Sequence, residues 1–151
     1  MSLGGGFSLS INKMVSDCFN AGIHVVVSAG DTGGDACDVS PASAPQAITV
    51  GGTEKSTNDI AAFSNTGSCV DIYAPGRDIV AAGASDLITA LSIASGTSQA
   101  APHVAGTIAL IISKQNNASP SSMTNTLISL STKNILTDTI PNNRFLFVPT
   151  P

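Results

Sequence analysis

Residues 23–28, with the sequence IHVVVS, form a continuous run of mostly nonpolar residues directly after a segment with helical periodicity. Residues 9–21 repeat apolar side chains at the spacing of an amphipathic helix, and Gly22 stands where a left-handed residue would end it. A strand without alternating polar residues is buried on both faces, which is typical of parallel sheets. A helix followed by such a strand therefore predicts parallel crossovers and a fold of the α/β class.

Apolar and helical segments continue to alternate along the remaining chain. Strands are expected at residues 47–51, 70–73, 79–81 and 87–93, and helices at 98–113 and 119–130. Pro120 fits the first turn of the last helix, where its missing N–H removes no hydrogen bond. The sequence has no internal repeat and no linker-like stretch, so its 151 residues predict one domain or a part of one.

The composition excludes several classes of protein. With 42% hydrophobic and 11% charged residues, the chain is globular in character and long enough for a real core. A net charge of −4 leaves no basic stripe for nucleic acid. The longest apolar runs, near Val25 and Ile111, are too short to cross a bilayer. We therefore expect neither a nucleic-acid partner nor a membrane span.

The sequence SGTSQAAPHVAG, at residues 95–106, places a serine next to a glycine turn and just ahead of a long apolar helix. Gly96 allows backbone geometries closed to other residues, and Ser98 falls near the first turn of the predicted helix. Backbone N–H groups point outward at a helix N-terminus, and the helix dipole there favours negative charge. Ser98 is therefore a candidate nucleophile whose attack on a carbonyl creates an oxyanion.

The chain contains three cysteines, which leaves one without a partner in any disulfide scheme. Cys37 and Cys69 lie among Gly, Ser and Asp in loop-like sequence, whereas Cys18 lies within the helical segment 9–21. We predict a Cys37–Cys69 disulfide and a free Cys18. Three reduced thiols in a cytosolic protein remain the alternative, because sequence alone rarely defines connectivity.

Seven blocks of the sequence resemble the C-terminal half of the catalytic domain of subtilisin-like serine proteases (peptidase family S8), closest to the proteinase K branch. They follow the order and spacing of that family and span nearly the whole chain, at residues 1–5, 27–30, 40–45, 48–51, 63–65, 70–76 and 95–106. Gln99 replaces a methionine common in the family, and in this it is similar to the ninth proprotein convertase of animals. The resemblance implies a three-layer α/β fold with a mostly parallel sheet flanked by helices. Residues 1–151 would then be the C-terminal part of one catalytic domain, with no second domain.

The resemblance implies a role for each matching position. Ser98 would be the acylating nucleophile of an endopeptidase whose chemistry requires no cofactor. An unpaired backbone edge of small residues suits a polypeptide substrate, and this edge would consist of Ser2, Leu3 and Gly4. The opposite wall of the pocket, for the residue before the scissile bond, would consist of Ser28, Ala29 and Gly30.

The catalytic triad of the family is incomplete in this sequence. Family members order it as Asp, His and Ser, and the first two motifs lie upstream of the segment that resembles residues 1–5. The sequence has two histidines, His24 in a predicted strand and His103 five positions after Ser98, about 140° round a helix. We expect structural roles for both, so the chain by itself is predicted to be inactive. Its expected partners are the missing N-terminal half of the domain and a pro-segment.

Asp31 is a second departure from the family. It stands in the motif SAGD, where the family usually has an asparagine whose side-chain amide donates to the oxyanion. A carboxylate only accepts hydrogen bonds and would repel the developing charge, whereas its protonated form can donate. Asp31 therefore predicts slow or acid-shifted turnover, or inactivity. An ordinary role as a loop or N-cap residue before Thr32 is equally open.

A structural calcium site is also implied by the resemblance. The matching positions are the carbonyls of Pro45 and Ala47 and the carboxylate of Asp71. Calcium prefers hard oxygen ligands of this kind, and a single carboxylate predicts modest affinity. The alternative for Asp71 is a local hydrogen-bonding role at the end of a strand.

Two classes of function remain open at this point. The first is a serine endopeptidase, secreted or held in the secretory pathway or a vacuolar lumen, whose full-length form supplies the missing Asp and His. The second is a catalytically weak or inactive subtilase-like module that binds a protein through the same sheet edge. We favour the enzyme, because a mere binder would not need Ser98 in its complete motif.

Overall fold

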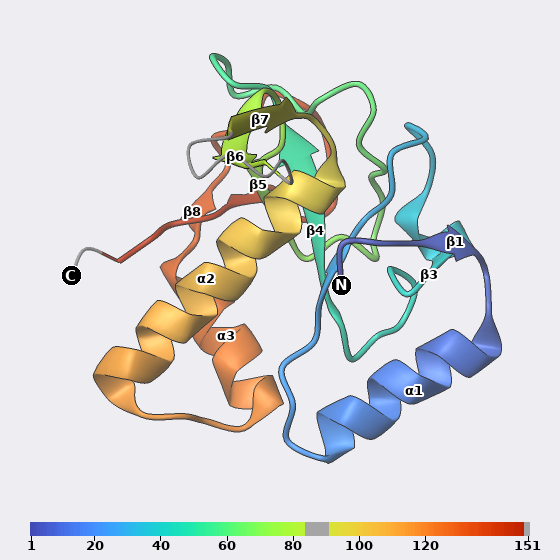
Figure 1. The fold of residues 1–151 in the computed structure, drawn as a ribbon, viewed down its shortest axis with the longest axis vertical. Coiled ribbons are helices and arrows are strands. Elements are labelled where there is room, and N and C mark those ends of the chain that lie inside the picture. Colours follow the sequence, from blue (N-terminus) through green and yellow to red (C-terminus); the bar gives the residue numbers. More distant parts are fainter. Residues whose placement is uncertain (84–90, 150–151) are drawn as a thin grey trace.

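A five-stranded sheet lies at the centre of the computed structural model, which describes residues 1–83 and 91–149 (Figure 1). Its strand order is β2 (Val26–Ser28), β4 (Ile48–Thr53), β5 (Ile72–Pro75), β9 (Arg144–Phe145) and β8 (Thr132–Lys133). The first four strands pair in parallel, and β8 runs antiparallel to β9. The mostly parallel sheet predicted from the buried strands is therefore confirmed.

The helices α1 (Leu9–Asn20), α2 (Thr97–Gln115) and α3 (Pro120–Leu130) cover the two faces of this sheet. Alternate strand residues point to opposite faces. Val26 packs in one apolar cluster with residues of α2 and α3, whereas Val25 and Val27 pack in another with Val15 of α1. The predicted three-layer arrangement of helices around a sheet is thus confirmed.

Local sequence signals explain where the helices begin and end. The hydroxyls of Ser8 and Ser119 accept hydrogen bonds from backbone N–H groups in the first turns of α1 and α3, which is the usual role of an N-cap serine. Pro120 occupies the first turn of α3, as predicted. Gly22 adopts a left-handed conformation (φ 83°) directly after α1, so the predicted helix end is confirmed to within one residue.

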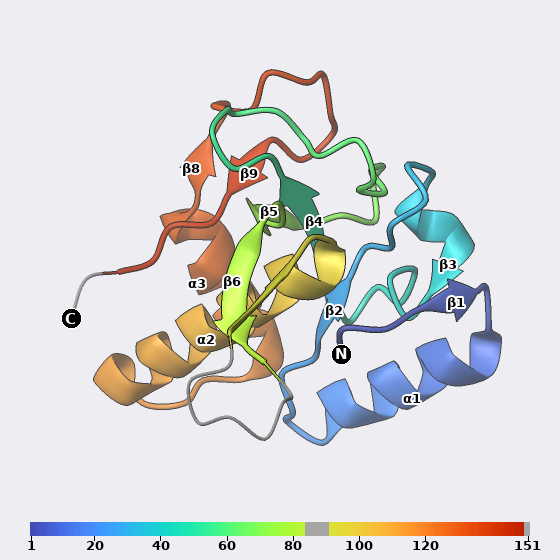
Figure 2. The same cartoon turned by 45° about the horizontal axis from the view of Figure 1, so that its top comes forward.

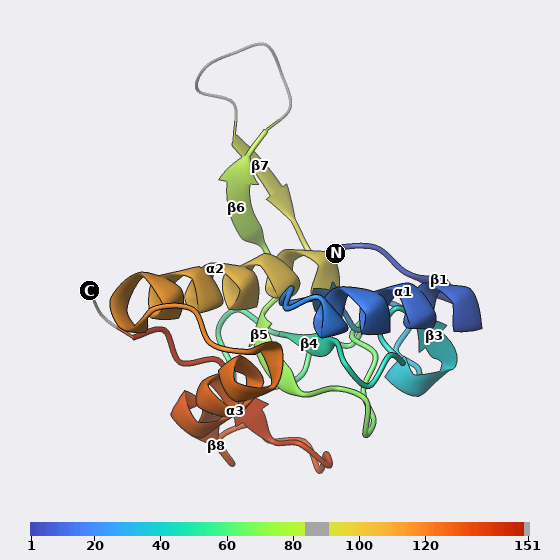
Figure 3. The ribbon, with the colours of Figure 1, turned by 90° about the horizontal axis from the view of Figure 1, so that it is seen from below.

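A β-hairpin projects from this α/β body, formed by β6 (Ile79–Ala82) and β7 (Leu91–Ala94) (Figure 3). Its two strands are antiparallel, so the expectation of parallel crossovers does not extend to this part of the chain. The physical reason is the short connection, because a parallel pair needs a crossover of about a dozen residues or more. Of the strand predicted at 87–93, residues 87–90 lie outside the described residues and 91–93 belong to β7.

A second small sheet pairs β1 (Gly5–Gly6) with β3 (Val39–Ser40) in antiparallel orientation (Figure 2). The short 3₁₀ helix η1 (Ala36–Asp38) directly precedes β3. None of these elements was predicted, since two-residue strands have no periodicity to detect. In residues 1–83 and 91–149, no helix combines the length and apolar character that crossing a lipid bilayer demands.

Cys37 and Cys69 form a disulfide with a Cα–Cα distance of 5.3 Å, and Cys18 is free. The predicted pairing is therefore confirmed. The bridge joins the end of the loop after β2 to the segment that leads into β5, and it closes a sequence separation of 32 residues. It lies beside an apolar cluster that includes Ala36, Val70 and Tyr73.

Replacing both bridged cysteines by serine is expected to lower the free energy of unfolding of the full-length protein by about 3–4 kcal/mol, because the open loop gains entropy when unfolded. Guanidinium unfolding of the double variant measures this difference. Cys18→Ser provides the matched control and should change the free energy of unfolding by about 1 kcal/mol or less. A peptide map without reductant that links Cys18 to either other cysteine would contradict the assignment.

Candidate active site

Ser98 is the second residue of α2, directly after a turn that requires glycine. Gly96 has φ 154°, and a Cβ at this position would lie 2.9 Å from Asp31 Oδ2 and 2.9 Å from Gln99 Oε1. Its N–H donates to the Gly76 carbonyl at 2.9 Å, which ties the turn to the end of β5. The first N–H groups of a helix have no partners within it, so Ser98 lies in a region of positive electrostatic potential.

The start of α2 is hydrogen-bonded to the N-terminal segment through a carbonyl that a proline leaves free. Pro102 has no N–H, so it gives no helical hydrogen bond to the carbonyl of Ser98, four residues earlier. The Ser2 hydroxyl donates to that carbonyl at 2.8 Å, and the Ser98 hydroxyl donates in return to the Ser2 carbonyl at 3.3 Å. This reciprocal pair places the predicted substrate edge directly beside the predicted nucleophile.

A cavity of about 410 Å³ opens next to Ser98. Among the residues predicted for the site, those that line it are Gly4, Ser28, Gly30, Asp31 and Ser98. Ala29 is fully buried behind the wall, and Leu3 is exposed outside the cavity. The lining residues that sequence reasoning missed include Val39, Asn65 and Thr97. Asn65 lies in the block 63–65, so a signal was present, but the resemblance assigned it no role.

Asp31 binds the first residue of α2. Its Oδ1 accepts hydrogen bonds from the Thr97 N–H at 2.7 Å and from the Thr97 hydroxyl at 2.8 Å. The Thr97 hydroxyl oxygen accepts in turn from the Gly30 N–H at 3.1 Å. A carboxylate at a helix N-terminus is stabilised by the unpaired N–H groups and the dipole. Asp31 thus caps a distant helix, instead of the turn that follows it in sequence.

The two histidines make contacts away from the Ser98 hydroxyl. The Nδ1 of His103 lies 2.8 Å from the Gln99 carbonyl oxygen, and its ring lines a different hollow of about 540 Å³. The Nε2 of His24 lies 2.8 Å from Asn117 Oδ1, between the ends of α1 and α2. Within the described part of the chain, neither ring is hydrogen-bonded to Ser98. Neither is positioned here as its general base.

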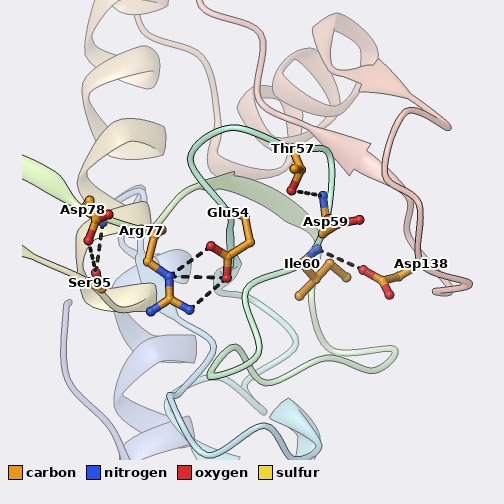
Figure 4. Close-up of polar contacts among 8 residues, drawn as sticks. All are labelled: Glu54, Thr57, Asp59, Ile60, Arg77, Asp78, Ser95 and Asp138. Atoms are coloured by element: carbon orange, nitrogen blue, oxygen red, sulfur yellow. Dashed lines mark hydrogen bonds and ion pairs between the residues drawn. The ribbon is translucent and has the colours of Figure 1, made fainter.

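Polar contacts fix the base of the β6–β7 hairpin, just ahead of Ser98 (Figure 4). The Asp78 N–H donates to the Ser95 hydroxyl oxygen at 2.9 Å. Arg77 makes an ion pair with Glu54 at 2.8 Å and stacks over Phe63, with 4.8 Å from its guanidinium carbon to the ring centre. The hydrogen bond from Arg77 lowers the pKa of the Glu54 carboxyl. These contacts hold the segment that enters the Gly96 turn.

Pro45, Ala47 and Asp71, the three residues predicted to bind calcium, line one separate cavity of about 220 Å³. Asp71 Oδ2 accepts a hydrogen bond from the Thr49 N–H at 2.8 Å, and burial raises the pKa of the Asp71 carboxyl. Asp71 is half-buried, and its carboxylate, which shares this cavity with Pro45 and Ala47, is one of the hard oxygen donors that calcium prefers. In the two described stretches, no three His, Cys, Asp or Glu side chains gather into a metal-binding group. The residues present therefore fit a calcium site with a single carboxylate.

The parallel sheet, together with Ser98 at a helix N-terminus beside a cavity, defines the class: an α/β protein with a candidate nucleophilic serine. Residues 1–147 match the peptidase S8 (subtilase) family, and the chain belongs to that family. The family and the subtilisin-like fold predicted from the seven sequence blocks are thus confirmed.

Individual relatives agree with this membership. The chain is 44% identical over 138 residues to alkaline protease 1 of Aspergillus clavatus, covering 91% of this chain and 34% of that protein. It is 45% identical over 136 residues to an extracellular serine proteinase of Thermus sp., covering 90% of this chain and 33% of that protein. A crystal structure of a cold-adapted subtilisin-like serine proteinase superposes with a TM-score of 0.91 at 38% identity, covering 100% of this chain and 54% of that one. The chain therefore spans about a third of the length of these sequence relatives.

Proposed function

We propose that the full-length protein is a serine endopeptidase in which Ser98 is the nucleophile. The observation that carries the proposal is the place of the Ser98 hydroxyl, at the N-terminus of α2 and at the edge of the 410 Å³ cavity. In acylation, Ser98 Oγ forms a bond to the scissile carbonyl carbon while its proton passes to a general base. The C–N bond then breaks, and the amine leaves with a proton. Water hydrolyses the acyl-enzyme by the same steps and regenerates the hydroxyl.

The base of this reaction comes from outside the residues placed around Ser98. We assign it, with its aspartate partner, to the part of the full-length catalytic domain that the relatives have beyond the match. Without a base, a serine hydroxyl is a weak nucleophile at neutral pH. The chain by itself is therefore proposed to be inactive, and its polypeptide substrate is cleaved only by the complete domain.

The substrate is proposed to bind along the segment of Ser2, Leu3 and Gly4. Its backbone would pair with that of the segment, and the residue before the scissile bond would enter the cavity bounded by Ser28 and Gly30. Reciprocal hydrogen bonds between Ser2 and Ser98 support this orientation, since they hold the edge against the nucleophile. The chemistry itself needs no cofactor.

We further propose that the protein works outside the cytosol, as the name of the extracellular proteinase from Thermus states for that relative. The Cys37–Cys69 bridge supports this, because disulfides persist in oxidising compartments. A pro-segment and a vacuolar location belong to the same proposal. The second candidate function, a protein-binding module with little activity, is favoured by Asp31, which puts an acceptor carboxylate at the cavity beside Ser98.

The direct test uses the full-length protein, incubated with casein and separately with a fluorophosphonate that labels activated serines. The proposal expects casein cleavage and a single labelled peptide containing Ser98. Binding of casein without cleavage, together with no label on Ser98, would instead support the binding module.

Calcium is proposed to have a structural role, held by the backbone carbonyls of Pro45 and Ala47 and by Asp71. When bound, it would supply positive charge to the half-buried carboxylate of Asp71. Calcium at about 100 times its dissociation constant is expected to stabilise the full-length protein by about 2.7 kcal/mol, seen as a rise in Tm over a sample with chelator. Asp71→Asn should remove this rise, and the exposed Asp38→Asn is the matched control that should keep it. An unchanged rise in Asp71→Asn would place the calcium elsewhere.

A further inference from the structure

We propose that Asn65 is a positioning residue of the active site. Its buried side-chain amide holds residues 29–34, the loop that carries Asp31 and one wall of the cavity, in place relative to Ser98. This inference rests on the proposed function, because it concerns the same site. Asn65 contributes no reacting group and acts through the loop that it holds.

The hydrogen bonds of Asn65 go almost entirely to this loop. Its Oδ1 accepts from the Thr32 N–H at 3.1 Å, from the Thr32 hydroxyl at 2.8 Å and from the Gly34 N–H at 2.9 Å. Its Nδ2 donates to the Ala29 carbonyl at 2.9 Å, and its backbone N–H donates to the Gly30 carbonyl at 2.9 Å. One residue thus contacts the loop on both sides of Asp31.

The burial of Asn65 makes these bonds strong constraints. Its side chain is 0% exposed, whereas Asp31, Thr32, Gly33 and Gly34 are all exposed. Ala29 is buried in an apolar cluster, but residues 31–34 have little apolar burial of their own to hold them. A buried amide without hydrogen-bond partners destabilises a fold, so the amide and the loop stabilise one conformation together.

Gly30 shows how closely the amide controls the wall of the cavity. This glycine has φ 102°, and a Cβ on it would lie only 2.4 Å from Asn65 Nδ2. The amide therefore occupies the space that any larger residue at position 30 would fill. The position of the wall is set by contact with Asn65 as well as by hydrogen bonds.

A continuous set of contacts joins Asn65 to the nucleophile. Asn65 holds the Gly30 carbonyl and the Thr32 N–H, and Asp31 between them binds Thr97, the residue before Ser98. Thr97 in turn accepts from the Gly30 N–H. The loop is thus clamped between Asn65 on one side and the start of α2 on the other. Without the Asn65 side chain, Asp31 and the wall would be kept in register with Ser98 by the Thr97 contacts and by backbone hydrogen bonds of the loop, such as that from the Gly33 N–H to the Phe63 carbonyl.

The test compares Asn65→Ala with Asn143→Ala in the full-length protein. Asn143 is a matched control, because its amide also bridges the backbone of a loop, with Oδ1 accepting from the Leu136 N–H at 3.1 Å and Nδ2 donating to its carbonyl at 2.8 Å. We expect kcat/KM on a peptide substrate to fall by about 10- to 100-fold in Asn65→Ala, as for other misplaced active-site groups. Amide hydrogen exchange at Thr32 and Gly34 should become at least about tenfold faster. Asn143→Ala should lower Tm yet leave kcat/KM within about twofold.

A second variant keeps the test decisive if Asn65→Ala does not fold. Asn65→Asp retains the acceptor for Thr32 and Gly34 but loses the donor to the Ala29 carbonyl. It should keep the exchange protection of the two amides while kcat/KM still falls. The inference is overturned if either Asn65 variant keeps wild-type kcat/KM, or if the protection of Thr32 and Gly34 survives in Asn65→Ala. Absence of serine-dependent turnover in the wild type would refute the proposed function instead, and the exchange experiment would still decide the role of Asn65.

Discussion

Ser98→Ala in the full-length protein is expected to lower kcat by about 10⁶-fold, the size of the loss known for the equivalent change in a protease of this family. The methyl group cannot form the acyl-enzyme, so only transition-state binding by the remaining site would continue to act on the substrate. Steady-state hydrolysis of a chromogenic peptide, calibrated by titration of active sites, measures the loss. The KM should change much less than kcat, because the hydroxyl contributes little to ground-state binding.

Ser95→Ala is the matched control for this substitution. Its hydroxyl is three residues away in the same motif but bonds to Asp78 at the hairpin base, so kcat should stay within about tenfold of the wild type. The chain of residues 1–151 alone should hydrolyse no substrate faster than its own Ser98→Ala variant, because no base is hydrogen-bonded to the hydroxyl within residues 1–83 and 91–149. Serine-dependent turnover by this chain alone would show that the base lies within it.

Asp31→Asn is expected to raise kcat of the full-length protein by at least about tenfold at pH 7–8, toward the 10²–10³-fold value of one oxyanion donor known from this same family. The structure supports this direction of change. Asp31 Oδ1 already serves the Thr97 N–H and hydroxyl as an acceptor, and an asparagine Oδ1 can do the same. The amide Nδ2 then replaces Oδ2, which lies beside the Gly96 turn just before Ser98. An acceptor next to the developing negative charge becomes a donor.

A substitution at another aspartate, measured at the same pH, provides an independent check of this gain. Asp35→Asn is the matched control, since its Oδ1 accepts from the Cys37 N–H at the start of η1, and kcat should be unchanged within about twofold. An Asp31→Asn variant no faster than wild type at this pH would place Asp31 outside the oxyanion site and remove the slow-enzyme interpretation.

The Asp31 and Asn65 experiments inform each other. If Asn65 holds the loop, the gain from Asp31→Asn should be smaller in an Asn65→Ala background, because a displaced amide no longer faces the oxyanion. Independent effects would multiply instead, which would mean that the Thr97 contacts and the backbone hydrogen bonds of the loop keep residue 31 in place without the Asn65 side chain.

Local patterns in the sequence were sufficient for the helices, for the parallel strands β2, β4 and β5, and for the family, but not for the two-residue strand β9. The end of α1 at Gly22 and the start of α3 at Pro120 depend on residues within one turn, so their signals lie next to each other in the chain. The buried strands β2, β4 and β5 were found from their apolar runs, although their bounds differ from the prediction by one to three residues. The motif at residues 95–106 likewise identified Ser98 as a candidate nucleophile, because its residues lie next to each other in the chain.

Tertiary structure alone decided how distant segments meet. The reciprocal bonds between Ser2 and Ser98 span 96 residues and depend on the carbonyl that Pro102 leaves free. Asp31 caps α2 instead of its own turn because the fold brings Thr97 within 2.7 Å of its carboxylate. An asparagine amide can form hydrogen bonds in any loop. The burial of Asn65 against residues 29–34 determines which groups it binds here. Such contacts leave no periodic pattern in the sequence, because they join residues that become neighbours only when the whole domain folds.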